Sequence, residues 1–86
     1  MNQYIMITAP GCGMCSLAKI NLKREGLLDS ITILQPPQAM PLILQTGLKS
    51  VPIFIVLDEN KKIMLQTLDV RAFIKYMKIQ SEESMI

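Results

Sequence analysis

Two cysteines, Cys12 and Cys15, are the residues of this 86-residue chain whose type and spacing most directly suggest chemistry. They are the only cysteines in the sequence, and Gly13 and Met14 separate them. A thiolate can attack a disulfide, and a neighbouring thiol can then resolve the mixed disulfide that forms. The pair therefore indicates thiol–disulfide exchange, with Cys12 and Cys15 as the candidate catalytic residues.

Two other interpretations of the cysteine pair stay open at this point. A zinc site needs four ligands, and the chain has no histidine and no further cysteine, so the sequence predicts no metal site within one chain. The cysteines could also be two small buried apolar residues whose spacing is accidental.

A strand, a loop and a helix are predicted around the pair. Residues 4–8 form a short apolar run, which is typical of a buried strand, and Ala9-Pro10-Gly11 ends it. A helical pattern follows over residues 13–25, with Gly26 placed to end it. This strand–loop–helix context favours the redox interpretation of the cysteines.

The predicted helix gives the two cysteines different roles. Cys12 lies at its N-terminus, where unpaired backbone N–H groups and the helix dipole both stabilise a thiolate. Cys15 lies one turn further along the same face, where it can reach the Cys12 sulfur and is better shielded from solvent. Cys12 is therefore expected to attack the substrate, and Cys15 to resolve the mixed disulfide.

The rest of the chain predicts three more strands and two more helices, with Pro36-Pro37 closing the second strand. Strands are expected over residues 31–34, 52–57 and 62–66, and helices over residues 38–46 and from 67–69 onward. The order β-α-β-α-β-β-α makes the first two strands parallel and the last two antiparallel. We expect an α/β fold with a four-stranded mixed sheet flanked by three helices, in one domain over residues 1–80. Residues 81–86 are expected to be a flexible tail.

The tripeptide Ser50-Val51-Pro52 opens the expected third strand. A proline there costs no hydrogen bond of the sheet, so an ordinary trans proline is one interpretation. Cis X–Pro bonds are concentrated in tight turns, and a cis Val51–Pro52 bond would turn the Val51 backbone toward the cysteines. That backbone could pair with an extended substrate. Val51 and Pro52 are therefore candidate substrate-binding residues, as is Met14.

With these two segments in register, the chain resembles the glutaredoxin branch of the thioredoxin superfamily over residues 3–77. Residues 8–15, TAPGCGMC, resemble the family's first strand and active-site loop. Residues 46–55, TGLKSVPIFI, resemble its TG-x-x-[ST]-V-P segment, which carries a cis-proline. The resemblance implies a thioredoxin-like fold, with Cys12 as nucleophile and Cys15 as resolving cysteine.

The resemblance also implies an activity. Family members reduce protein disulfides, ribonucleotide reductase among their substrates, or glutathione mixed disulfides. Glutathione, or in some cases thioredoxin reductase, recharges them. The expected function is thus a disulfide reductase with no tightly bound cofactor and with glutathione as a co-substrate. The alternatives are a glutathione-assisted iron–sulfur cluster carrier and a redox-regulated binding module.

The expected glutathione site departs from the family pattern. Family members place a Gly-Gly pair before an acidic residue that opens the last helix, whereas residues 65–69 here read LQTLD. Asp69 is a candidate glutathione contact, and a helix N-cap is an equally consistent role. Lys49 is a candidate contact for a glutathione carboxylate, and a solvated lysine is the other interpretation. Leu65 and Gln66 are expected to crowd the tripeptide, so glutathione binding is expected to be weak.

Composition restricts the other partners. The net charge is +2, from nine basic and seven acidic residues scattered along the chain, which is too small to predict nucleic-acid binding. The longest apolar run, residues 53–57, is far shorter than the roughly 20 residues of a membrane span. The N-terminus lacks the pattern of a signal peptide. We therefore expect a cytoplasmic protein. We also expect a monomer, and the resemblance implies that it acts on disulfide-containing proteins.

Overall fold

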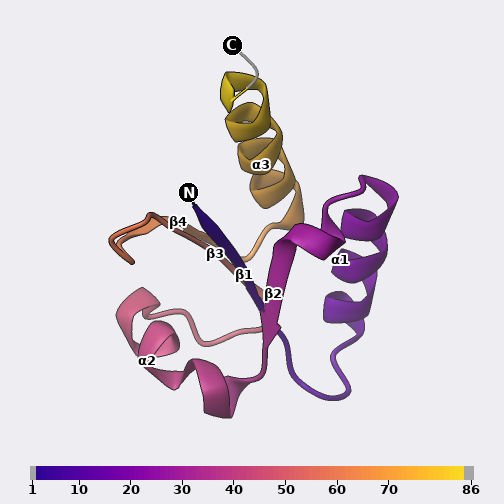
Figure 1. Cartoon of the computed structure of the whole chain (residues 1–86). Coiled ribbons are helices and arrows are strands. Elements are labelled where there is room, and N and C mark those ends of the chain that lie inside the picture. Colours follow the sequence, from indigo (N-terminus) through magenta and orange to yellow (C-terminus); the bar gives the residue numbers. More distant parts are fainter. Residues whose placement is uncertain (1, 85–86) are drawn as a thin grey trace.

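The computed structural model describes residues 2–84 and, for side chains, residues 2–80. Within them, the elements follow the predicted β-α-β-α-β-β-α order, with one short 3-10 helix in addition (Figure 1). The strands are β1 (Gln3–Ile7), β2 (Ile31–Leu34), β3 (Ile53–Leu57) and β4 (Ile63–Thr67). The helices are α1 (Gly13–Arg24), α2 (Pro36–Thr46) and α3 (Val70–Ser84), and the 3-10 helix η1 (Leu28–Ser30) precedes β2.

The four strands form one mixed sheet in the order β2-β1-β3-β4. β1 and β2 are parallel, with Tyr4 opposite Ile31, as the predicted β-α-β crossover requires. β3 is antiparallel to both β1 and β4. The expected α/β fold, with a parallel first unit and an antiparallel final hairpin, is therefore confirmed.

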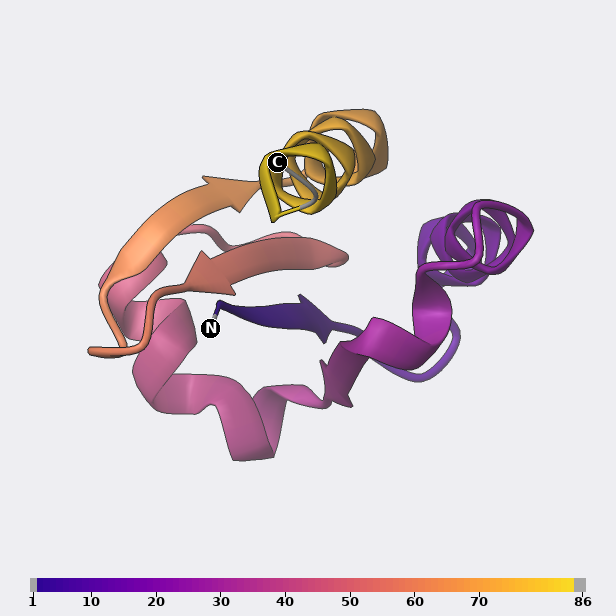
Figure 2. The same ribbon diagram turned by 45° about the horizontal axis from the view of Figure 1, so that its top comes forward.

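β3 lies in the middle of the sheet and is buried along its whole length. Because side chains alternate between the two faces of a strand, β3 contributes to two separate cores. Phe54 and Val56 join the core under α1 and α3. The other β3 side chains join the core under α2. Figure 2 shows α1 and α3 on one side of the sheet and α2 on the other.

The double proline does not close β2, as the sequence suggested; it opens α2. Pro36 and Pro37 occupy the first two positions of the helix, where a backbone N–H has no partner within the helix. Gln35 precedes them as the N-cap, and its backbone N–H donates to Oε1 of Gln38 at 3.2 Å. Helix α2 therefore begins two residues before the expected start at Gln38.

The C-terminal helix continues past the expected boundary at residue 80. α3 reaches Ser84, so residues 81–84 of the expected tail are helical in the backbone. Neither glycine nor proline interrupts this stretch, and glutamate is a good helix former. Residues 85–86 of that tail lie outside the described residues. No helix within residues 2–84 combines the length and the apolar character needed to cross a membrane.

Candidate functional site

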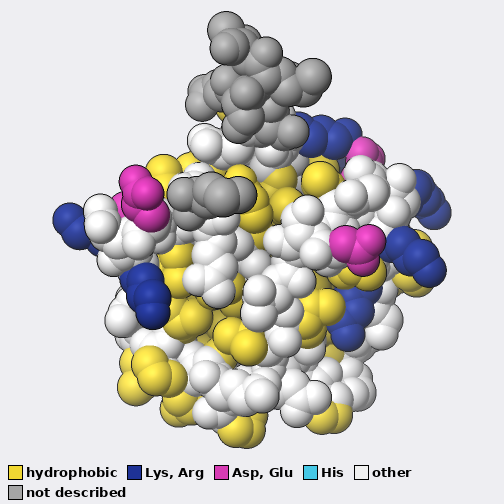
Figure 3. Space-filling model, in the orientation of Figure 1, with side chains coloured by type: hydrophobic (Ala, Val, Ile, Leu, Met, Phe, Trp, Pro, Cys, Tyr) yellow, Lys and Arg dark blue, Asp and Glu magenta, His cyan; other side chains and the backbone are white. Residues whose placement is uncertain are grey.

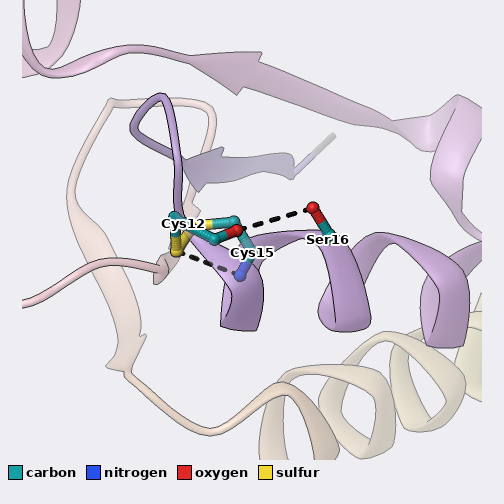
Figure 4. The surroundings of a disulfide bond; sticks show 3 residues. All are labelled: Cys12, Cys15 and Ser16. Carbon is teal, nitrogen blue, oxygen red and sulfur yellow. Dashed lines mark hydrogen bonds between the residues drawn. A yellow bond between two sulfur atoms is a disulfide. The ribbon is translucent and has the colours of Figure 1, made fainter.

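Cys12 and Cys15 are joined by a disulfide at the N-terminus of α1 (Figure 4). Their Cα atoms are 5.2 Å apart, within the range that a disulfide spans without displacing the backbone. The loop that follows β1 delivers Cys12 to this point, and the first turn of α1 carries Cys15. The structure thus joins the two cysteines that the sequence singles out as the candidate catalytic pair.

Cys12 is the N-cap residue of α1. Its backbone is extended, and its Sγ accepts the backbone N–H of Cys15 at 3.0 Å. This is the position and the hydrogen bond that serine, threonine, aspartate or asparagine usually provides. The first turn of α1 contains no acidic residue to offset the positive end of the helix dipole. The Cys12 sulfur is therefore placed where negative charge on it is stabilised.

The two sulfur atoms differ in solvent access. Cys15 is only 3% exposed and belongs to the core cluster that includes Phe54 and Phe73. Cys12 is partly exposed and packs against the edge of the same cluster. An incoming disulfide can therefore reach Cys12 more easily than Cys15.

We expect the Cys12 thiol in the reduced protein to have a pKa below the ordinary thiol value of about 8.5. The cause is the N–H of Cys15 together with the dipole of α1. The rate of alkylation against pH, measured on Cys15→Ser, reports the midpoint for Cys12. The Cys12→Ser variant is the matched control, because it leaves only the buried Cys15 thiol to react. A Cys12 midpoint at or above 8.5 would contradict the expectation.

The carboxyl end of α2 fixes the loop that leads to Pro52. Gly47 ends the helix with φ of 70°, a left-handed conformation that glycine adopts without steric cost. The Thr46 hydroxyl donates to the Ile43 carbonyl at 2.9 Å and accepts the Leu48 N–H at 3.1 Å. Nε2 of Gln66 on β4 donates to the Thr46 carbonyl at 3.0 Å. Local and long-range hydrogen bonds thus hold the start of this loop.

The Val51–Pro52 peptide bond, at the end of that loop, is cis. Pro52 is buried, whereas Val51 is partly exposed and packs against both cores of the molecule. Cys12 also packs against the core that holds Cys15. Val51 and Cys12 therefore lie at the edge of one common cluster, although they are 39 positions apart in the sequence.

A groove of about 260 Å³, which we call the site groove, runs along α1 from the second residue of the helix. Its lining includes Met14, Leu17, Pro52, Leu68 and Asp69. Met14 is 65% exposed, Leu17 57% and Leu68 46%, so the groove has an apolar rim open to solvent. Three residues expected from the sequence meet here: Met14, Pro52 and Asp69. Lys49 is exposed in the loop after α2 and is not among the groove's lining residues.

Leu65 and Gln66 do not crowd this groove, contrary to the expectation from the sequence. Leu65 packs against the core under α1 and α3, and the Gln66 side chain is bonded to α2. Leu68, two residues later, takes the rim position instead. Leu68 and Leu17 could not be predicted from the sequence, because their exposure depends on where β4 ends and how α1 packs.

Asp69 is the N-terminal cap of α3, one of the two roles that the sequence left open. Its Oδ1 accepts the Arg71 N–H at 2.9 Å, and its own N–H donates to the Thr67 hydroxyl at 3.0 Å. The carboxylate also lies on the wall of the site groove. Asp69 is thus fixed in place by local hydrogen bonds whether or not a ligand is present.

We expect Asp69→Ala to lower the free energy of unfolding by about 1 kcal/mol, since it removes this cap. Asp69→Asn is the matched control, because asparagine caps a helix about as well and carries no charge. Urea unfolding of the three proteins checks this expectation. Equal losses for alanine and asparagine would show that charge, and not capping, is the stabilising property.

A second recess, of about 430 Å³, contains the disulfide itself, because both Cys12 and Cys15 line it. Ser16, Lys19 and Gln35 are among its other lining residues, together with the loop before Cys12. The Ser16 hydroxyl donates to the Cys12 carbonyl at 3.5 Å (Figure 4). The Ser16 backbone N–H donates to the same carbonyl at 3.3 Å. Among the residues whose side chains the structure describes, no group of three or more metal-ligating side chains is found.

No family model and no curated protein matches this sequence. Several solved structures do resemble the fold. Thioredoxin f from spinach chloroplast matches with a TM-score of 0.63 and 19% identity, covering 93% of this chain and 74% of that one. The germline-specific thioredoxin Deadhead of Drosophila melanogaster matches with 0.62 and 16%, covering 90% and 78%. Thioredoxin-2, a component of the malaria parasite protein secretion machinery, matches with 0.58 and 20%, covering 91% and 82%. The chain therefore has a thioredoxin fold.

Proposed function

We propose that this chain is a thiol–disulfide oxidoreductase of the glutaredoxin type that reduces protein disulfides through Cys12 and Cys15. One observation carries the proposal: the Cys12 sulfur caps α1 and accepts the Cys15 N–H, while Cys15 is almost fully buried behind it. This arrangement provides an accessible, stabilised thiolate and a shielded second thiol one helical turn away. Thiol–disulfide exchange needs both.

The proposed reaction begins with the reduced pair. The Cys12 thiolate attacks one sulfur of the substrate disulfide, forms a mixed disulfide and displaces the other sulfur as a thiolate that takes up a proton. The Cys15 thiol then loses its proton and attacks Cys12 Sγ. This step forms the Cys12–Cys15 disulfide and releases the second substrate thiol. Two electrons pass from the protein to the substrate, and the protein is left in the oxidised state that the structure shows.

The loop before β3 supports binding of an extended substrate segment. Val51 precedes the cis bond and lies beside the cluster that Cys12 joins. Its backbone N–H and C=O would pair with the substrate backbone, as an added strand does. Met14 and Pro52 would contact the substrate side chains from the site groove.

Glutathione fits this site less well than a protein segment. The groove beside the cysteines has three exposed apolar side chains on its rim, which suit the apolar side chains of a peptide. The Asp69 carboxylate could accept a hydrogen bond from the glutathione amino group. Lys49, in the loop after α2, remains a proposed contact for a glutathione carboxylate. Glutathione is therefore proposed as a weakly bound co-substrate, with glutathione or a thioredoxin reductase returning electrons to the pair.

A coupled assay tests the proposed function. NADPH oxidation in the presence of a model protein disulfide is followed once with glutathione and glutathione reductase, and once with thioredoxin reductase. Turnover that depends on the chain in either arm supports a disulfide reductase and identifies its reductant. If neither arm shows turnover and the dithiothreitol-reduced chain also fails to reduce the substrate stoichiometrically, the proposal is wrong.

A further inference from the structure

A third cavity, distinct from the site groove and from the recess at the disulfide, lies between α1 and α3 and has a basic lining. Its volume is about 530 Å³. Four of the chain's nine basic residues line it: Arg24, Arg71, Lys75 and Lys78. Val70, Ile74 and Ile79 form its apolar part. We call it the basic groove. Figure 3 shows Lys and Arg side chains gathered on the side of the molecule where α1 lies.

The basic groove continues the site groove that begins beside the disulfide. Asn21, Val70 and Arg71 line both of them. The wall formed by α1 runs from Met14 in the site groove to Arg24 in the basic groove, and Glu25, the C-cap of α1, follows it. A bound peptide segment that extends from the cysteines along the space between α1 and α3 would therefore enter the basic groove.

The charges of the basic groove are only partly neutralised within the chain. Lys78 forms an ion pair with Glu25, and both side chains stay accessible to solvent. Within the described residues, no ion pair involves Arg24, Arg71 or Lys75. These three cations therefore offer a positive potential to a ligand.

The position of Arg71 is not explained by helix stability. It lies in the first turn of α3, where the helix dipole disfavours a cation, and the first turn contains no acidic residue. Its side chain lies where the two grooves meet. A positive charge at this point suits an acidic ligand that extends from the disulfide.

We propose that the basic groove binds an acidic segment of a protein whose disulfide is being reduced at Cys12 and Cys15. This inference rests on the proposed function and names the substrate class of that site: an extended segment with apolar residues next to its cysteine and carboxylates further along. The apolar rim of the site groove contacts the apolar residues of this segment. Arg71, Lys75 and Arg24 bind its carboxylates. Recognition by several exposed charges favours selective encounter over tight binding.

The length of α1 sets where the carboxylates lie in such a substrate. Cys12 and Arg24 are separated by a helix that rises about 1.5 Å per residue, or about 18 Å in all. An extended segment covers about 3.3 Å per residue. The acidic residues therefore lie about five or six residues from the reacting cysteine.

Synthetic peptides test this selectivity. Each contains one disulfide and, about five residues from it, a run of either glutamates or glutamines. The fully prereduced 86-residue chain is mixed with each peptide for a single turnover, and acid-quenched samples give the second-order rate constant. Because the chain itself supplies both electrons, no reductase is required. We expect the glutamate peptide to react about tenfold faster at low salt, with the advantage shrinking as salt rises.

Two charge-matched variants separate the basic groove from net charge. Arg24→Glu with Lys75→Glu should bring the ratio of the two rate constants close to one. Lys61→Glu with Lys62→Glu makes the same change in net charge in the turn between β3 and β4, and it should keep most of the ratio. A wild-type ratio near one, or an equal loss in both variants, would overturn the proposal.

A binding measurement keeps docking separate from chemistry. A cysteine-free, fluorescent version of the glutamate peptide is titrated with the chain, and its anisotropy is followed. Weaker binding to the Arg24→Glu/Lys75→Glu variant than to the Lys61→Glu/Lys62→Glu variant supports the basic groove even if neither disulfide peptide is reduced. In that case the proposed reductase activity alone fails. Equal binding to the two variants would contradict the basic groove as the docking site.

Discussion

Replacing Cys12 with serine is expected to reduce the rate of protein-disulfide reduction by about a thousandfold or more. A serine hydroxyl is not ionised near neutral pH and cannot form the mixed disulfide, so the first step is lost. The fold should be kept, because serine is a preferred N-cap and can accept the same N–H of Cys15 that the Cys12 sulfur accepts. The coupled assay measures the rate, and urea unfolding of the reduced proteins measures the stability.

The same substitution separates chemistry from folding. A Cys12→Ser protein of unchanged stability and negligible rate places the nucleophile at Cys12. A variant that keeps its rate within about tenfold of the wild type would remove Cys12 from that role. The reciprocal assignment, with Cys15 as nucleophile, would then have to explain how a disulfide reaches a side chain that is 3% exposed.

Replacing Cys15 with serine is expected to lower turnover about a hundredfold with a protein disulfide as substrate. The first step can still occur at Cys12, but the resolving thiol one turn away is gone, and a thiol from solution must replace it. An aligned intramolecular group has a large effective concentration, so its loss slows the step strongly. Mass spectrometry should detect the mixed disulfide between Cys12 and the substrate, which the wild type does not accumulate.

Ala18→Ser is the matched control for this variant. Ala18 lies about one turn beyond Cys15 in the same core cluster and is also 3% exposed, so its replacement adds a hydroxyl to the same buried surface. Its turnover should stay near that of the wild type, apart from any effect of lower stability or, because Ala18 also lines the site groove, of the added hydroxyl on substrate binding. If Cys15→Ser keeps most of its activity with glutathione as the sole reductant, a one-cysteine route through glutathione is operating and the two-cysteine mechanism is wrong.

The local part of the candidate site could be predicted from the sequence. Cys12 and Cys15 are neighbours along the chain, and the helix that begins at Gly13 follows from a regular apolar pattern, so their relative placement needs no tertiary information. The directions of the strands within the β-α-β unit and within the final hairpin were also predictable, because each unit permits few arrangements. Both inferences rely on short-range pattern.

The start of α2 shows where such reasoning failed. Two consecutive prolines usually signal a break in regular structure, and here they lie in the first turn of a helix. The first turn is the one place where missing N–H groups cost nothing, and Gln35 with Gln38 supplies the cap. A proline pair is compatible both with the end of a strand and with the first turn of a helix. Here the cap formed by Gln35 and Gln38 distinguishes the second case from the first.

The basic groove was beyond the reach of the sequence. Arg24 lies on α1, and Arg71 and Lys75 lie on α3, 47 and 51 positions later. In the sequence, Arg71 and Lys75 recur at helical spacing, but nothing places Arg24 beside them. The three cations form one surface only because α1 and α3 pack side by side on the same face of the sheet.

The short separation of the two cysteines has a consequence for the scaffold as a whole. A cross-link stabilises a fold mainly by restricting the unfolded chain, and the restriction grows with the length of chain enclosed. Cys12 and Cys15 are only three positions apart within the cap and first turn of one helix, so the bond encloses almost nothing. Opening and closing it leaves the sheet, both cores and the neighbouring helices with the same connectivity. Reduction of the Cys12–Cys15 bond is therefore expected to change the free energy of unfolding only slightly.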